Sequence, residues 1–219
     1  MEDKVSKTRI SRRRFLALTG GALGATALAC GGLITLGTQQ PAIEFIQSNC
    51  GKDQNMADQV LVAYASRCGA TGEVAQAIGQ VWCNQGMVVD VRLAKEVSDL
   101  SRYRAVFLGS AIRAGRWLPE AVDFVKKHQA ALSQLPVTYF VVCLTLREDT
   151  EENRRKVAAY LDPAYEILKP ANVGLFAGKM DYGKLSFLDR QIAKMKIPEG
   201  DFRNWDAIRT WATQMSPAA

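Results

Sequence analysis

A short apolar run, followed by a small polar loop and an amphipathic pattern, constrains the fold of this chain most. The run Val60-Leu61-Val62-Ala63-Tyr64 has the pattern of a strand buried on both faces. Beyond the loop, apolar residues recur at helical spacing, at Val74, Ala77, Ile78, Val81 and Trp82. The segment is therefore predicted to be a strand, a tight loop and a helix.

The loop at residues 65–71 has chemistry that suits an anion. A helix N-terminus offers unpaired backbone N–H groups and the positive end of the helix dipole. The hydroxyls of Ser66 and Thr71 can add donors, and Gly69 lets the backbone approach a ligand closely. Because ligands of open parallel sheets bind at the carboxyl ends of the strands, we expect an anion site here.

The rest of the chain continues to alternate between strands and helices. The later strands are predicted at 87–91, 105–109, 138–142 and 171–178, and the later helices at 118–132, 150–161 and 205–215. This alternation predicts an α/β fold with a doubly wound sheet of five parallel strands flanked by helices, in the order 2-1-3-4-5. That order places the site beside the first and third strands.

The loop Ser66-Arg67-Cys68-Gly69-Ala70-Thr71 resembles the FMN phosphate loop of flavodoxins, which has the form S/T-x-S/T-G-x-T. Cys68 departs from this form, because a thiol is a weak donor. The resemblance implies FMN as cofactor, with its phosphate held by backbone N–H groups, Ser66 and Thr71. The absence of a lysine after the glycine and of G-x-G-x-x-G argues against a P-loop NTPase or a dinucleotide fold. An ordinary turn capped by Thr71 is the alternative.

In the same resemblance, two further loops flank the flavin ring. They contain Ser110, Ala111, Ile112, Arg113, Gly115 and Trp117 after the third strand, and Cys143, Leu144 and Thr145 after the fourth. Trp117 is the aromatic side chain available to cover the ring, with a packed position at the start of the next helix as the alternative. The second loop has no aromatic residue, which would leave the flavin more open to a substrate or quinone.

Three stretches, 109–115, 124–128 and 177–182, together with Leu188-Asp189-Arg190, narrow the resemblance. They look like the menaquinone-dependent protoporphyrinogen dehydrogenase branch of flavodoxin-like proteins, over about residues 59–213. This implies an oxidoreductase in which FMN takes electrons from a porphyrinogen and passes them to a membrane quinone, without a separate catalytic side chain. The alternatives are an electron-carrier flavodoxin that binds protein partners and a flavodoxin-like scaffold without flavin.

The resemblance also implies an insertion near the fifth strand, at about residues 179–204. Apolar residues lie there at helical spacing among basic ones: Leu185, Leu188, Ile192 and Met195 with Lys184, Arg190, Lys194 and Lys196. We expect a basic amphipathic helix, which either lies on an anionic membrane surface or packs on the domain.

The N-terminus predicts export. Ser11-Arg12-Arg13-Arg14-Phe15-Leu16 precedes an apolar run that ends near Leu36 and is about long enough to cross a bilayer. It resembles a twin-arginine export signal. Since no clear A-x-A cleavage site follows, residues 1–36 are expected to form an N-terminal hydrophobic helix that anchors the domain to the membrane, facing the extracytoplasmic side. Release after cleavage is the alternative, and Cys30 is a weak candidate for lipidation.

Residues 37–58 are predicted to be a linker with a short helix near 43–46, and residues 59–216 to be the FMN-binding domain. Of the net charge of +6, residues 1–14 carry +4, from six basic and two acidic side chains. No basic stripe with interleaved aromatics occurs, so nucleic acid is not an expected partner.

The cysteines at 30, 50, 68, 83 and 143 lack metal-ligand spacing, so no metal site is expected and disulfide pairing stays open. Cys83 and Cys143 are predicted to be buried thiols. Cys68 is predicted to have a lowered thiol pKa because it precedes a helix N-terminus. His128 is expected to be a cation favoured by a helix C-terminus.

Overall fold

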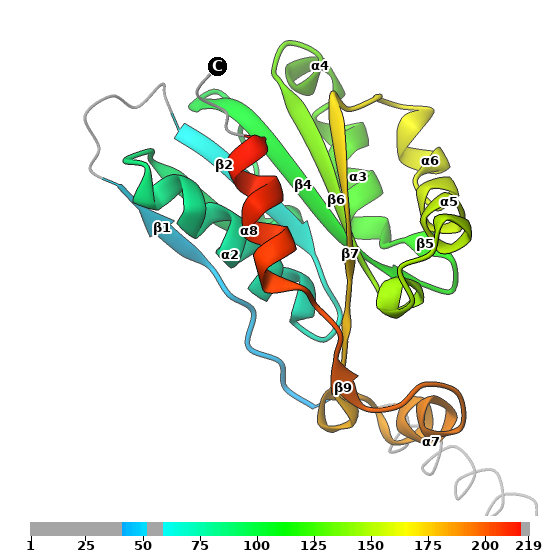
Figure 1. The fold of residues 1–219 in the computed structure, drawn as a ribbon. Coiled ribbons are helices and arrows are strands. Elements are labelled where there is room, and N and C mark those ends of the chain that lie inside the picture. Colours follow the sequence, from blue (N-terminus) through cyan, green and yellow to red (C-terminus); the bar gives the residue numbers. More distant parts are fainter. Residues whose placement is uncertain (1–40, 52–58, 216–219) are drawn as a thin grey trace, which may run out of the picture.

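The computed structural model describes residues 41–51 and 59–215. Its central sheet has the order β1-β3-β2-β4-β6-β7 (Figure 1). The strands are β1 (Ser48–Cys50), β2 (Gln59–Ala65), β3 (Val89–Leu93), β4 (Tyr103–Arg113), β6 (Val137–Cys143) and β7 (Asn172–Ala177). From β3 to β7 every neighbouring pair is parallel, which confirms the predicted five-stranded fold and its order. The predicted signal or anchor, including Cys30, lies outside the described residues.

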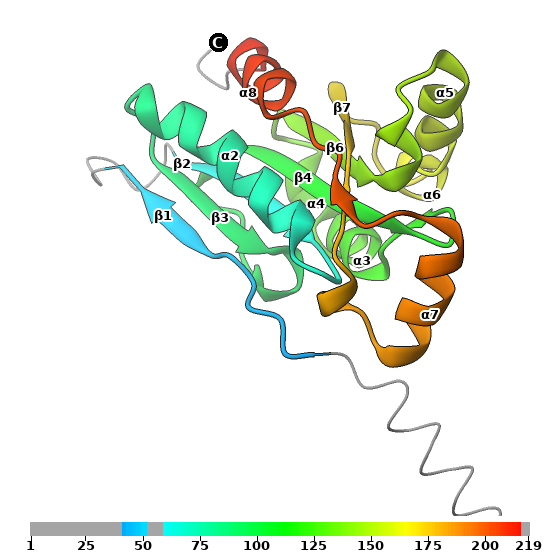
Figure 2. The same ribbon diagram turned by 60° about the horizontal axis from the view of Figure 1, so that its bottom comes forward.

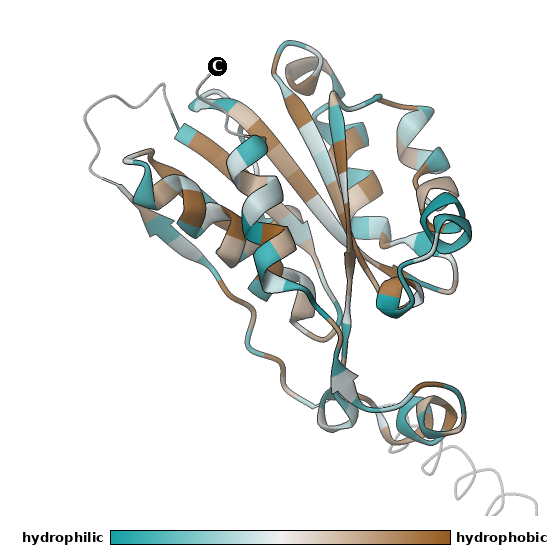
Figure 3. Cartoon of the chain, viewed as in Figure 1, coloured by the Kyte–Doolittle hydropathy of each residue, from teal (hydrophilic) through white to brown (hydrophobic). Residues whose placement is uncertain are grey.

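Helices cover both faces of the sheet (Figures 1 and 2). One face packs on α2 (Ala70–Asn84) and α8 (Trp205–Gln214), and the other on α3 (Pro119–Lys127), α4 (Gln129–Leu132), α5 (Glu151–Ala159) and α6 (Asp162–Tyr165). Short 3-10 helices occur at η1 (Ala94–Glu96), η2 (Leu144–Arg147) and η3 (Tyr182–Lys184). In the hydropathy view the strands between these layers are the most apolar part of the domain (Figure 3).

Strand β2 explains why the first apolar run organises the chain. Val62 and Tyr64 face the α2 and α8 layer, whereas Leu61 and Ala63 face the α3 layer. All seven residues of β2 are buried. A central parallel strand with helices on both sides has no solvated face, so its sequence is apolar throughout instead of alternating.

The segment before β2 differs from the prediction. No helix forms near 43–46; instead β1 pairs antiparallel with β3 at the edge of the sheet. Asn49 Nδ2 donates to Asp90 at 2.8 Å, and the Tyr64 hydroxyl donates to the Ile46 carbonyl at 2.7 Å. Part of the predicted linker therefore belongs to the folded domain.

A disulfide between Cys50 and Cys83 joins β1 to the last turn of α2, with the two Cα atoms 6.0 Å apart. The prediction that Cys83 is a buried small apolar residue was wrong, because its half-buried side chain forms the disulfide with the edge strand. Cys143 is a buried free thiol, as predicted.

Two other predicted elements have different limits. The predicted helix at 118–132 is divided at His128 into α3 and α4. The strand predicted at 105–109 extends to Arg113 and turns back through β5 (Arg116–Trp117), with which it forms an antiparallel hairpin. The hairpin projects the end of β4 beyond its neighbours.

After β7 the chain makes an excursion at the carboxyl end of the sheet (Figures 1 and 2). Strands β8 (Lys179–Met180) and β9 (Gly200–Asp201) form a small antiparallel sheet, and α7 (Phe187–Lys196) lies between them in sequence. This excursion is the insertion predicted at about 179–204. Within the described residues, no helix has both the length and the apolar character needed to cross a bilayer.

Candidate functional site

A cavity of about 920 Å³ lies at the carboxyl ends of β2, β4 and β6. The excursion after β7 and helix α7 form another of its walls. Twelve of the predicted site residues line it: Ser66, Arg67, Cys68, Ala70, Thr71, Ala111, Ile112, Arg113, Gly115, Cys143, Leu144 and Thr145. Gly69, Ser110 and Trp117 are not among the lining residues. The structure thus brings all three predicted loops to one cavity, at the edge where open parallel sheets bind ligands.

The loop after β2 prepares the N-terminus of α2 for an anion. Gly69 is the N-cap residue and has a φ of 87°, a left-handed conformation that favours glycine. Its N–H donates to Ser66 Oγ at 3.0 Å, which shapes the turn and leaves the Ser66 hydroxyl proton available to a ligand. Because no side chain caps α2, its first N–H groups face the cavity edge without a competing carboxylate.

Thr71 provides the clearest test of whether a phosphate fits this loop. Its hydroxyl is buried and has no hydrogen-bond partner within the described part of the chain. A buried polar group without a partner is costly, and a ligand oxygen can satisfy it. The alternative interpretation of the loop, an ordinary turn capped by Thr71, does not hold, since the Thr71 side chain makes no capping bond. The donors present fit the phosphate of FMN.

Lys184 adds a cation that sequence reasoning did not assign to the site. Its Nζ lies 3.5 Å from the point that a Cβ on Gly69 would occupy. It also lies 3.8 Å from Glu73 in the first turn of α2, and Arg203 pairs with the same carboxylate at 2.8 Å. Two basic groups thus offset the Glu73 carboxylate beside the loop. Lys184 is far from Gly69 in the sequence, so only the fold shows this approach.

Cys68 has the opposite behaviour to the one expected. Burial raises the pKa of its thiol, and this outweighs the lowering by Arg113 and Lys184. The prediction of a lowered pKa was wrong because the thiol leaves solvent, with its Sγ 3.7 Å from the Lys184 carbonyl. Cys68 therefore enters the cavity wall as a neutral thiol.

The hairpin after β4 supplies the second wall. Ala114 and Gly115, both with positive φ (50° and 71°), form a two-residue turn between Arg113 and Arg116. Ser110 holds the base of this hairpin, because its hydroxyl donates to the Ala111 carbonyl at 2.8 Å and accepts from the Leu118 N–H at 3.1 Å. Ser110 is buried, and its role in the structure is to fix the loop.

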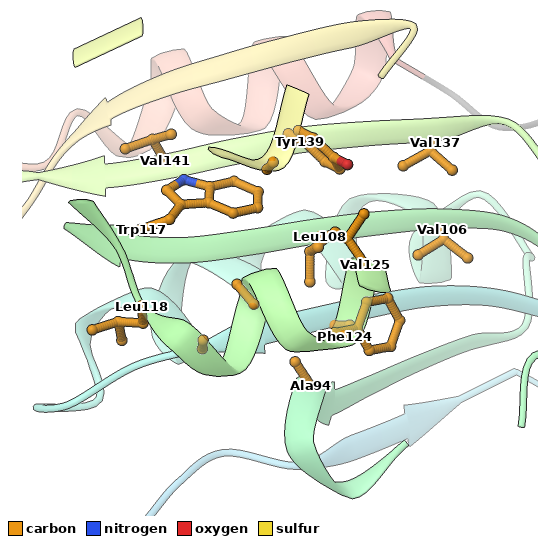
Figure 4. Close-up of a cluster of buried hydrophobic side chains, with 14 of the residues drawn as sticks. Ala94, Val106, Leu108, Trp117, Leu118, Phe124, Val125, Val137, Tyr139 and Val141 are labelled. Carbon is orange, nitrogen blue, oxygen red and sulfur yellow. The ribbon is translucent and has the colours of Figure 1, made fainter. Parts of the chain in front are cut away.

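Trp117 belongs to the core and not to the cavity. Its indole is buried and packs on Tyr139 with ring centroids 4.9 Å apart, next to Val141 and Leu118 (Figure 4). Pairing of Trp117 with Ile112 turns the side chain toward the α3 layer. Of the two positions considered for this residue, the structure adopts the packed one.

Tyr160 is the aromatic side chain that does line the cavity. It follows the last residue of α5, and its ring lies 3.3 Å from the point that a Cβ on Gly115 would occupy. Its position opposite the β4–β5 turn suits contact with a flat ring. In the sequence, Tyr160 belongs to the helix predicted at 150–161. No sequence pattern indicated that this helix would end beside the loop after the third strand.

The rim of the cavity is more basic than acidic. The basic lining residues are Arg67, Arg113, Arg147, Lys179 and Lys196, and the acidic ones are Glu148, Asp181 and Asp189. Several of them pair, including Arg67 with Glu120 at 2.9 Å and Arg113 with Asp189 at 3.4 Å. In the described ranges, no group of three or more His, Cys, Asp or Glu side chains could hold a metal ion.

A doubly wound parallel sheet with an uncapped helix N-terminus after its first parallel strand and a cavity at its carboxyl edge defines a flavodoxin-like α/β protein. The pattern of the flavodoxin domain family matches residues 61–202, so the chain belongs to that family.

Individual proteins with a known name are similar to this chain at low sequence identity. The chain is 26% identical over 178 residues to the protoporphyrinogen IX dehydrogenase (quinone) of Leishmania major, over 74% of this chain and 76% of the relative. It is 23% identical over 175 residues to the protein of the same name from Escherichia coli K12, over 72% and 94%. Among solved structures it resembles oxidised flavodoxin 2 from Bacillus cereus, with a TM-score of 0.46 and 20% identity over 71% of this chain and 95% of that one.

Proposed function

We propose that this protein is an FMN-dependent oxidoreductase similar to protoporphyrinogen IX dehydrogenase, which passes electrons from a porphyrinogen-like donor to a membrane quinone. The observation that carries the proposal is the cavity that joins the unpartnered Thr71 hydroxyl and the N-terminus of α2 to the ends of β4 and β6. Two relatives in different organisms bear the name of this activity.

In this proposal each wall of the cavity has one task. The phosphate is held by the first N–H groups of α2 and by the Ser66 and Thr71 hydroxyls, with Lys184 as a nearby cation. Residues 111–113 and 143–145 flank the ring from two neighbouring strand ends, and Tyr160 contacts it. FMN supplies the redox chemistry when bound, and the protein sets its orientation and environment. No catalytic side chain is required.

The walls beyond the three loops favour an enzyme over a simple electron carrier. Helix α7 and the β8 segment enclose a side of the cavity that the flavin loops leave open. Lys179 and Lys196 on this wall, beside Asp181 and Asp189, and Arg147 in η2 can face the carboxylates of a porphyrinogen-like donor. A carrier that exchanges electrons with protein partners does not need this additional wall beside the flavin.

We place the domain outside the cytoplasm, anchored to the membrane by residues 1–36. The disulfide between Cys50 and Cys83 supports this location, because disulfides persist in oxidising compartments. The twin-arginine-like segment supports export of a protein that folds before it crosses the membrane. The donor at that location is a porphyrinogen-like compound or a protein.

The test starts with the native protein purified from membranes. Heat release of the cofactor should give FMN, and the loaded protein should reduce a menaquinone analogue when it is given protoporphyrinogen under anaerobic conditions. FMN without quinone turnover would favour the electron-carrier alternative. A colourless protein that does not take up added FMN would overturn the proposal and favour a flavin-free scaffold.

A further inference from the structure

Helix α7 has an uncovered apolar face. Its large apolar side chains have exposed fractions of 58% for Phe187, 45% for Leu188, 52% for Ile192 and 75% for Met195. Among the described residues, the exposed large hydrophobic side chains are these four, and all of them lie in α7. A contiguous apolar patch of this kind marks an interaction surface, whereas single exposed apolar residues need no explanation.

The arrangement of these residues around the helix gives the face its direction. At about 100° per residue, Leu188, Ile192 and Met195 lie on one side of α7, opposite Ala193, which is buried against the domain. Lys196 lies at one border of the apolar side, whereas Lys194 lies further round the helix, with its Nζ 5.7 Å from the centroid of the Tyr182 ring. In the hydropathy view, apolar and polar residues alternate along α7 (Figure 3).

The charge of α7 is basic. It contains Arg190, Lys194 and Lys196 and one acidic residue, Asp189. The Asp189 carboxylate is engaged on the inner side, where it accepts from the Ser186 hydroxyl at 2.9 Å and pairs with Arg113 at 3.4 Å. With three basic residues against one acidic residue, α7 is cationic as a whole, which complements an anionic surface.

The excursion holds this face in a defined position. Arg203 is buried, donates to the Ala70 carbonyl at 3.2 Å and pairs with Asp201 in β9 at 2.6 Å, so the base of the excursion is fixed to the start of α2. The cavity reaches α7 at Asp189, Ile192, Ala193 and Lys196, so it meets one edge of the apolar face, whereas Phe187, Leu188 and Met195 are not among its lining residues. Figures 1 and 2 show α7 beyond the carboxyl edge of the sheet, apart from the other helices.

We propose that α7 docks in the interface of an anionic lipid bilayer, with its axis in the plane of the membrane. Its ten residues extend only about 15 Å, half of a hydrocarbon core, so the helix lies on the surface and does not span it. An exposed apolar side on a helix that also carries basic residues is the pattern of such interfacial helices. Docking of α7 does not depend on bound flavin. The idea that docking brings the cavity close to a lipid-soluble electron acceptor rests on the proposed function.

The test uses the full chain with Met195→Trp, because the four native tryptophans lie at 82, 117, 205 and 211, outside α7. Vesicles of phosphatidylcholine with or without phosphatidylglycerol carry brominated acyl chains, which quench tryptophan only at short range. The matched control is Gln134→Trp, an exposed position before β6, at the amino end of that strand. Wild type supplies the emission to be subtracted.

The added emission of Met195→Trp should be largely quenched in anionic vesicles and less in neutral ones, and that of Gln134→Trp in neither. Adding Lys194→Glu and Lys196→Glu should abolish the anionic preference. If the added emission of Met195→Trp is not quenched, the proposal is overturned. Unquenched emission that is also shifted to the blue would indicate that a second copy of the chain covers this face. Equal quenching in anionic and neutral vesicles would overturn the claim that the helix prefers an anionic surface. FMN content, measured by absorbance, tests the proposed function separately.

Discussion

Burial, more than the charge of neighbouring groups, sets the protonation of the single histidine. His128 lies at the break between α3 and α4, where a helix C-terminus favours a cation. Desolvation nevertheless lowers the pKa of its imidazole, although a hydrogen bond to the Val97 carbonyl acts in the opposite direction. The prediction that His128 is a cation is therefore wrong, because its ring is packed beside Phe124 and has lost most of its contact with water.

The lowered pKa of His128 predicts a pH dependence of stability. A depressed folded-state pKa contributes stability that is present above the unfolded value of 6.5 and is lost as the pH falls through the folded value. A proton NMR titration of the single imidazole should give a midpoint below 6.5. In urea unfolding, His128→Gln should reduce the loss of stability between about pH 7.5 and pH 5. A midpoint above 6.5 would contradict the account.

Lys184 should contribute charge to flavin binding. Lys184→Gln should weaken FMN binding about fivefold, on the order of 1 kcal/mol, because a partly exposed cation near a phosphate acts through a screened interaction. Binding of riboflavin, which has no phosphate, should not change. Isothermal titration with both ligands at two salt concentrations measures this, and an equal effect on the two ligands would exclude a role at the phosphate.

Replacement of Tyr160 should affect FMN binding, whereas replacement of Trp117 should affect the stability of the fold. Tyr160→Leu should weaken FMN binding by about 0.5–1.5 kcal/mol, through loss of a ring contact, with little change in stability. Trp117→Phe should lower the free energy of unfolding and leave FMN affinity unchanged, because the indole packs on Tyr139 within the core. Flavin fluorescence titrations and urea unfolding distinguish the two, and loss of FMN binding only in Trp117→Phe would reverse the assignment.

At the scale of elements, the part of the fold with strong periodicity was predictable. Strand β2 and helix α2 follow from buried apolar positions at their own spacing, and the strand order follows from alternation. Strand β1 has three residues and a polar sequence, so no pattern predicts it; its pairing depends on Asn49, Asp90 and the disulfide.

The candidate site was predictable at the level of loops and less so at the level of side chains. All three loops reach the cavity because strand ends of a parallel sheet share one edge. Whether Trp117 or Tyr160 faces that cavity depends on the β4–β5 hairpin and on the end of α5, which the local sequence does not specify. Lys184 approaches Gly69 only through the tertiary path of the excursion.

The disulfide should stabilise the edge of the sheet. It closes a loop across 33 residues, which corresponds to about 3–4 kcal/mol in the chain-entropy relation. Cys83→Ala should lower the free energy of unfolding by about 2–4 kcal/mol, and reduction of the wild type with dithiothreitol should have the same effect. Dithiothreitol should not destabilise Cys83→Ala further. Equal stability of oxidised and reduced wild type would contradict this role.

At the scale of the molecule, the sheet and its excursion have separate tasks. The sheet brings three strand ends and the N-terminus of α2 to one cavity, and the excursion adds a further wall and the apolar face of α7. Arg203 connects the two parts, since it pairs with Glu73 beside the phosphate loop and with Asp201 in β9. The proposed flavin site and the proposed membrane surface are therefore adjacent at one short helix, whose Ile192 and Lys196 also line the cavity.

The comparison of FMN with riboflavin in wild type and in Thr71→Val tests the central claim most directly. Charged hydrogen bonds of about 1.5–3 kcal/mol each to the phosphate should make wild-type affinity for FMN at least about 100-fold higher than for riboflavin. In Thr71→Val the ratio should fall by about tenfold or more, with riboflavin affinity unchanged. Equal affinity of wild type for the two ligands would contradict a phosphate site at the start of α2.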